Sequence, residues 1–172
     1  MNTKTLISLS LLVGIGAALH VIIPGFFLGM KPDMMLTMAF LAIILFPDKK
    51  SVFLVAITSG LISGLTTTFP GGLIPNIIDK CVTCFVFYLL FIGMRKISKS
   101  LVSIGILTVI GTLISGFVFL GSAYYLVGLP GAFLGLFAAV VIPATFLNTA
   151  AIIIIYPIVS GIVKKTSIAA HV

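Results

Sequence analysis

Five ionisable or amide side chains interrupt long apolar stretches of the sequence. They are His20, Asp33, Asp79, Lys80 and Asn148. Such groups are rare inside a lipid bilayer because they lose their hydration there, and they usually mark a path or a site for a ligand or ion. These five residues are therefore the first candidates for binding chemistry.

Opposite charges recur close together in two segments. Asn76, Asp79 and Lys80 have the spacing i, i+3, i+4, which places them on one face of a helix near its start, where the helix dipole favours an anion. Lys31 and Asp33 flank Pro32 where another apolar stretch begins. The pattern predicts that charges from separate segments meet within the protein.

Two interpretations of these charges remain open. In the first, an Asp simply neutralises a Lys, and the ion pair only holds the structure together. In the second, one Lys and one Asp are left to bind a ligand that carries both charges, such as an amino acid. A ligand with only a carboxylate would leave an Asp to be paired inside the protein.

Further candidates carry open alternatives. His20 would donate a hydrogen bond either to a ligand or to a backbone carbonyl, and Asn148 would bond either a ligand or a neighbouring helix. Aromatic rings expected near the outer ends of the helices stack well on a flat apolar ligand, although such rings also collect at membrane interfaces. These rings are Phe26, Phe27, Phe69, Tyr124, Tyr125 and Phe133.

The composition predicts that the chain is an integral membrane protein. Of 172 residues, 60% are hydrophobic and 8% charged, whereas about a quarter of the residues in a soluble domain are charged. At about 20 residues per span, the length allows six helices and no separate soluble domain. We expect a single all-α transmembrane substrate-binding domain over residues 1–172, with helices near 5–24, 33–46, 51–69, 77–94, 100–126 and 132–163.

The basic residues predict the orientation. Eight of the ten lie before the first span, after the last, or in the connections near residues 48–50 and 95–99. The positive-inside rule places these segments and both termini in the cytoplasm, so the net charge of +7 does not require a nucleic-acid partner. Small residues at 16–18 could also form a signal-peptide cleavage site, but its removal would leave an odd number of spans, which the charges do not fit.

The five candidates are expected at one depth. At 1.5 Å per residue from the cytoplasmic end of each span, they lie about 20 to 22 Å deep. Thr66, Thr67 and Ser115 fall at the same height. Because the hydrocarbon core is about 30 Å thick, this polar layer predicts a pocket that opens to the outside.

The sequence lacks the motifs of several enzymes. It contains no G-x-x-x-x-G-K-[ST] phosphate loop, no H-E-x-x-H and no G-x-S-x-G. Cys81 and Cys84 form a C-x-x-C within one span, without a second pair or a neighbouring His, so we expect no metal site. We expect no enzyme activity and no cofactor in this chain; any ATP would be used by partner subunits.

The first helix carries a stripe of small residues. Ser10, Gly14 and Ala18 recur every four residues, and this spacing lets another helix approach closely. His20 points about 120° to 160° away from Gly14 and Ala18 on a helical wheel. The stripe would either dock a partner helix or pack within the same chain.

Several charged and apolar motifs together resemble the tryptophan transport protein family, the membrane substrate-binding (S) components of energy-coupling factor transporters. They are GAALH at 16–20, GMKPDMML at 29–36, IPNIIDK at 74–80, VIGTLISG at 109–116 and IIYPIVS at 154–160. The resemblance implies six helices, capture of L-tryptophan from outside, and docking onto one transmembrane coupling subunit and two ATPases. It also implies an Ala-x-x-x-Ala docking motif, for which this chain has Gly14 and Ala18.

We therefore expect a bacterial cell-membrane S component that binds L-tryptophan through His20, Lys31, Asp33, Phe69, Asn76, Asp79, Lys80 and Asn148, beneath the loop at 25–32. The alternative is a stand-alone secondary transporter of an amino acid or related zwitterion, in which Asp33 or Asp79 binds the coupling proton. Substitution of Asp79 or Lys31 by Ala should weaken binding most.

Overall fold

The computed structural model describes residues 2–24, 33–96 and 100–165, and over these ranges the chain is helical without any strand. The helices are α1 (Thr3–Ile22), α2 (Met34–Leu45), α3 (Lys49–Leu65), α4 (Leu73–Met94) and α5 (Leu101–Leu126). They are followed by α6 (Phe133–Leu136), the π-helical segment η1 (Phe137–Val141) and α7 (Ile142–Lys165), which continue one another. The predicted all-α fold is confirmed, with six helical rods in the expected order.

Most predicted helix ends lie within a few residues of the observed ones. The exceptions flank the connection between α3 and α4. Helix α3 ends at Leu65, and α4 already begins at Leu73, because Pro75 in its first turn needs no backbone hydrogen-bond donor there. Gly71, with φ of +71°, makes the turn between them, a conformation that favours glycine.

The rods differ in their ability to cross a membrane. Four apolar helices are long enough: α1, α4, α5 and the continuous rod Phe133–Lys165. At 1.5 Å per residue, the 12-residue α2 is only about 18 Å long, and all its residues are buried. The chain is thus a multi-pass helical membrane protein with a short central helix shielded by its neighbours, and six full crossings remain a prediction.

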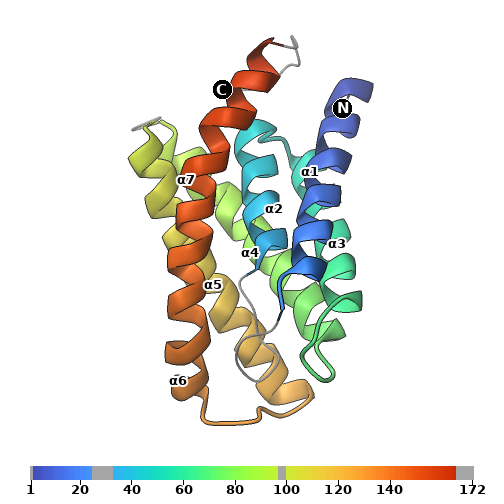
Figure 1. Cartoon of the computed structure of the whole chain (residues 1–172), viewed down its shortest axis with the longest axis vertical. Helices are drawn as coiled ribbons and strands as arrows, with labels where there is room; N and C mark the ends of the chain where they lie inside the picture. The colour runs from blue at the N-terminus through green and yellow to red at the C-terminus, as the bar shows by residue number, and fades with distance from the viewer. Residues whose placement is uncertain (1, 25–32, 97–99, 166–172) are drawn as a thin grey trace.

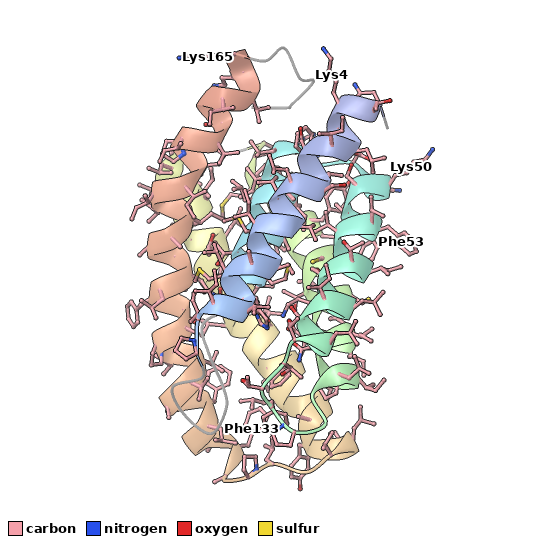
Figure 2. All side chains as sticks on the ribbon, turned by 45° about the vertical axis from the view of Figure 1, so that its right-hand side comes forward. Lys4, Lys50, Phe53, Phe133 and Lys165 are labelled. Atoms are coloured by element: carbon pink, nitrogen blue, oxygen red, sulfur yellow. The ribbon has the colours of Figure 1, made fainter. Side chains whose placement is uncertain are left out.

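The start of α1 and the end of α7 lie at one end of the bundle, together with the end of α2 and the start of α3 (Figure 1). Lys4, Lys50 and Lys165 project at this end, and Phe133 lies at the opposite end (Figure 2). We call these the basic end and the distal end. The even number of rods predicted from the charge pattern therefore matches the arrangement of the helices.

The core is built around α2. Phe40 of α2 stacks on Phe87 of α4 with ring centroids 3.9 Å apart. A Cβ atom at Gly111 would lie 2.7 Å from the Phe40 ring, so only glycine lets α5 approach this pair. This packing fixes α2, α4 and α5 relative to one another, about two helical turns from Asp33 and Asp79 toward the basic end.

Candidate functional site

A cavity lies between the helices in the distal half of the bundle. It contains about 680 Å³ of space outside protein atoms, a volume that includes open solvent at its mouth. Residues of α1, α2, α4, α5, η1 and α7 and of the α3–α4 connection form its wall. The last turn of α1 and the first turns of α2 and α4 meet here, because α1 runs away from the basic end whereas α2 and α4 run toward it (Figure 1).

Asp33 joins three helices at the cavity wall. It is the N-cap of α2, and its Oδ1 accepts a hydrogen bond of 2.9 Å from the backbone N–H of Leu36. The same oxygen lies 3.6 Å from Nδ1 of the buried His20 in α1, and Oδ2 forms an ion pair with Lys80 of α4. With 21% of its side chain exposed, Asp33 is the accessible member of this group.

Asp79 and Lys80 complete the charged cluster beneath the wall. Lys80 Nζ donates a hydrogen bond of 2.6 Å to Asp79 Oδ2, and both side chains are only 1% exposed. Asp79 also accepts hydrogen bonds from Thr83 at 2.8 Å and from Ser115 of α5 at 2.9 Å. The ion-pair interpretation therefore holds for Lys80, which is held between two carboxylates.

The charges of this cluster do not cancel. With both carboxylates ionised and His20 neutral, Asp33, Asp79 and Lys80 carry two negative charges and one positive charge, which leaves one net negative charge among these described residues. A buried charge without a counterion is costly. The cavity is consequently suited to a ligand that brings a positive charge.

Two amide side chains in the wall differ in their bonding. Asn76 donates a hydrogen bond of 2.7 Å to the carbonyl of Gly72, so that part of its amide holds the first turn of α4. Asn148 in α7 is fully buried, yet neither its amide oxygen nor its nitrogen has a hydrogen-bond partner within the described ranges. The helix-to-helix bond considered for Asn148 is thus not formed there.

The structure brings most predicted site residues to the cavity. Six line it: His20, Asp33, Phe69, Asn76, Asp79 and Asn148. Lys80 lies behind them in the charged cluster, and Lys31 lies outside the described residues, as does the loop at 25–32. Contact of any of these residues with a ligand remains a prediction.

The polar layer predicted from depth is partly reproduced by the other candidates. Thr67 and Ser115 line the cavity, whereas the Thr66 hydroxyl bonds the Ile62 carbonyl of its own helix. Helix α3 ends before Thr66, so the estimate of depth no longer applies to residues beyond that point.

The aromatic wall differs from the predicted set. Phe69 lines the cavity and packs edge to face on Phe119, a lining residue that sequence reasoning missed. Tyr124 and Tyr125 are 58% and 85% exposed on the distal surface, and Phe133 packs on Phe117 and Phe137. None of these three is among the cavity-lining residues described, and Phe26 and Phe27 lie outside the described ranges.

Other missed lining residues come from α5 and from the π-helical segment. Thr112 lies one helical turn before Ser115, the α5 residue that bonds Asp79, and Gly116 directly follows Ser115. Their positions relative to Ser115 are the signal that would have found them. Val140 and Val141 belong to η1. No feature of the sequence predicts the wider π-helical turn of this segment. Such π segments occur frequently at functional sites.

The small-residue stripe of α1 faces away from the bundle. Ser10, Gly14 and Ala18 are exposed, and a Cβ atom at Gly14 would meet nothing within 4 Å. Among the described residues, nothing packs closely against the stripe at Gly14. His20 is buried on the other face of the helix, so the predicted division of α1 into two faces is confirmed.

Together these features define a multi-pass helical membrane protein with a cavity inside its bundle whose largely apolar wall holds a few charged and amide groups. Residues 2–164 match the family model described as tryptophan transporter TrpP, and the chain belongs to this family. It is 56% identical over 167 residues to a probable tryptophan transport protein of Bacillus subtilis, with 97% of this chain and 96% of the relative covered.

More distant relatives carry the same name. A probable tryptophan transport protein of Clostridium acetobutylicum is 44% identical, with 96% of this chain and 95% of the relative covered. One of Clostridium perfringens is 38% identical, with 97% of each chain covered. No solved structure matches the chain.

Proposed function

We propose that this protein captures L-tryptophan in the cavity described above. The observation that carries the proposal is the net negative cluster of Asp33, Asp79 and Lys80 beside a largely apolar wall, in a member of the tryptophan transporter family. The substrate ammonium would approach Asp33, the accessible carboxylate, and the flat ring would lie against apolar side chains of the cavity wall. A ligand without an ammonium group would leave the Asp33 carboxylate without this partner.

The carboxylate of the zwitterion needs a cation or hydrogen-bond donors. Lys80 is already held by two carboxylates, which makes it a poor partner for a third. We therefore assign the substrate carboxylate to Lys31, the other lysine among the candidate site residues, with His20 as a further donor. In this scheme Lys80 sets the positions of Asp33 and Asp79 and contacts the substrate only through them.

We further propose that the chain is the S component of an ATP-driven energy-coupling factor importer. Its sequence contains no phosphate loop, so energy would come from two partner ATPases through a transmembrane coupling subunit. The exposed stripe of Ser10, Gly14 and Ala18 offers close approach to a helix of the coupling subunit. The basic end would face the cytoplasm of a bacterial cell, and the cavity would receive substrate from outside.

Binding by the purified chain tests the substrate. The chain contains no tryptophan of its own, so the fluorescence of a bound tryptophan can be followed above a background from only four tyrosines. We expect saturable binding, and we expect tryptamine, which keeps the ammonium, to compete better than indole-3-propionate, which keeps the carboxylate. The absence of saturable binding would refute the proposed substrate.

A second candidate for the energy source is favoured by the buried titratable cluster itself. His20, Asp33 and Asp79 would suit a stand-alone proton-coupled transporter, in which a carboxylate carries the coupling proton. Vesicles that contain this chain with or without the coupling subunit and ATPases separate the two. Uptake that requires the partners and ATP supports the S component, whereas uptake by the chain alone that a protonophore abolishes supports the secondary transporter.

A further inference from the structure

Two neutral polar groups in the cavity wall have unused hydrogen-bonding capacity. They are the amide of Asn148 in α7 and the hydroxyl of Thr112 in α5, which are 0% and 4% exposed. Neither has a hydrogen-bond partner in the parts of the chain that the structure describes, and both line the cavity. Because buried polar groups are normally hydrogen-bonded, each of these points to a group that enters the cavity.

Both groups lie at the inner end of the cavity. Helix α5 lines it from Thr112 to Leu120 and the last rod from Val140 to Asn148, each about 12 Å at 1.5 Å per residue. Helix α5 begins at the basic end and α7 ends there (Figure 1), so Thr112 and Asn148 are the lining residues of these helices nearest that end.

The charged cluster lies further out. Asp79 is bonded to Ser115, about one helical turn distal to Thr112, and Asp33 caps the distal end of α2. A ligand that places its ammonium at Asp33 would therefore extend its other end toward Asn148. Between these points the wall contains the apolar side chains of Leu36, one turn after Asp33, and Ala144, one turn before Asn148.

This arrangement selects the chemistry of the group that reaches Asn148. A carboxylate at this depth would be an anion bound only by neutral groups and close to Asp79, which is costly. A plain hydrocarbon ring would leave the amide unpaired. A neutral N–H on the edge of an aromatic ring meets both requirements, since the amide oxygen can accept its hydrogen bond while the rest of the ring stays in apolar surroundings.

We infer that the Asn148 amide oxygen accepts a hydrogen bond from the ring N–H of the substrate and so makes the site selective for an indole. The inference rests on the proposed capture of tryptophan and assigns its ring specificity. Asn148 is then a binding residue at the inner end of the cavity, distinct from the charged residues that receive the amino-acid group.

The test compares two ligands that differ at one position of the ring. In β-(3-benzothienyl)-L-alanine a sulfur replaces the indole N–H of tryptophan, so shape and charges are kept but the donor is lost. Calorimetry with the purified wild-type chain should show a preference for tryptophan of roughly tenfold to a hundredfold, because the analogue leaves a buried amide unpaired. In Asn148→Leu the preference should fall to within about threefold, while the analogue binds at least as well as to the wild type.

A neighbouring residue supplies the matched control. Thr149 also has a buried hydroxyl without a hydrogen-bond partner among the described residues, but it does not line the cavity. Thr149→Val should keep the wild-type preference. If it abolished the preference as Asn148→Leu does, the assignment to Asn148 would be lost.

Each remaining outcome is decisive. A wild-type chain that binds both ligands equally well, or an Asn148→Leu variant that keeps the preference, overturns the inference and leaves tryptophan capture standing. An equal loss of both ligands in Asn148→Leu and in the smaller Asn148→Ala assigns Asn148 to the fold or to the substrate carboxylate, and also overturns it. A wild-type chain that binds neither ligand refutes the proposed function itself.

Discussion

At the scale of single residues, Lys80 determines the character of the site. Its ammonium holds two carboxylates from different helices close together, and the resulting cluster is buried except for part of Asp33. Two carboxylates without a cation between them would repel each other strongly in an apolar environment. The cluster therefore connects α2 to α4 and, in the proposed function, also attracts the substrate ammonium.

Replacing Lys80 should destabilise the protein more than any change at its charged surface. Lys80→Met keeps most of the apolar stem but leaves Asp33 and Asp79 without their shared cation, and we expect a loss of about 3–5 kcal/mol in the free energy of unfolding. Thermal unfolding in detergent measures the effect. Lys164→Met, at the exposed basic end, is the matched control and should unfold with the wild type; equal stability of both variants would show that the cluster does not hold the helices together.

At the scale of helices, the contact between α5 and η1 shapes the cavity. A Cβ atom at Gly116 would lie 2.3 Å from Cγ1 of Val141, so the absence of a side chain at Gly116 allows the π-helical segment to approach α5. Both residues line the cavity. The close contact between Gly116 and Val141 thus sets the width of the cavity on this side.

Adding one methyl group at this contact should separate the two helices. Gly116→Ala should cost about 1–3 kcal/mol in stability through overpacking and should weaken tryptophan binding, because the wall that holds the ring is displaced. The double variant Gly116→Ala with Val141→Ala should recover part of both losses. Gly121→Ala, where a Cβ atom meets nothing within 4 Å, is the control; if it impaired binding equally, the loss would not come from the contact with Val141.

At the scale of the whole molecule, the cavity and the small-residue stripe of α1 lie in different parts of the bundle. The cavity lies inside, whereas the small-residue stripe of α1 lies outside and touches no other part of the described chain at Gly14. Substrate capture and partner docking can therefore be changed independently, provided that the proposed S-component function is correct.

A bulky residue in the stripe should separate binding from transport. A Cβ atom at Gly14 meets no described atom within 4 Å, so Gly14→Leu should bind tryptophan as the wild type does, but uptake with the coupling subunit and ATPases should be lost because the helices cannot approach. Binding by the purified chain and uptake into vesicles are measured side by side. Gly121→Leu on α5, equally free of neighbours within 4 Å, should retain uptake; an equal loss of uptake in both variants, or of binding in Gly14→Leu, would contradict the division into two surfaces.

Sequence reasoning located the helices and the candidate polar residues well. Apolar runs long enough to cross a bilayer, bounded by charges, are enough to place a helix, because every backbone polar group in lipid must be satisfied internally. The same cost of burial singled out His20, Asp33, Asp79 and Asn148, which the structure brings to one cavity. The connection around Thr66 to Gly72 was misplaced, since turn geometry there depends on a glycine with positive φ.

By itself, then, the sequence determined that the chain is a helical membrane protein and which few residues are too polar for lipid, because both follow from the free energy of transfer along the chain. Only the tertiary structure decided that Lys80 is shared by Asp33 and Asp79 and that Asn148 has no hydrogen-bond partner in the described helices. It also decided that the segment packed against Gly116 is π-helical. These features depend on distances between side chains of different helices. Helical periodicity gives the face on which a residue lies, but the packing of neighbouring helices decides what that residue meets.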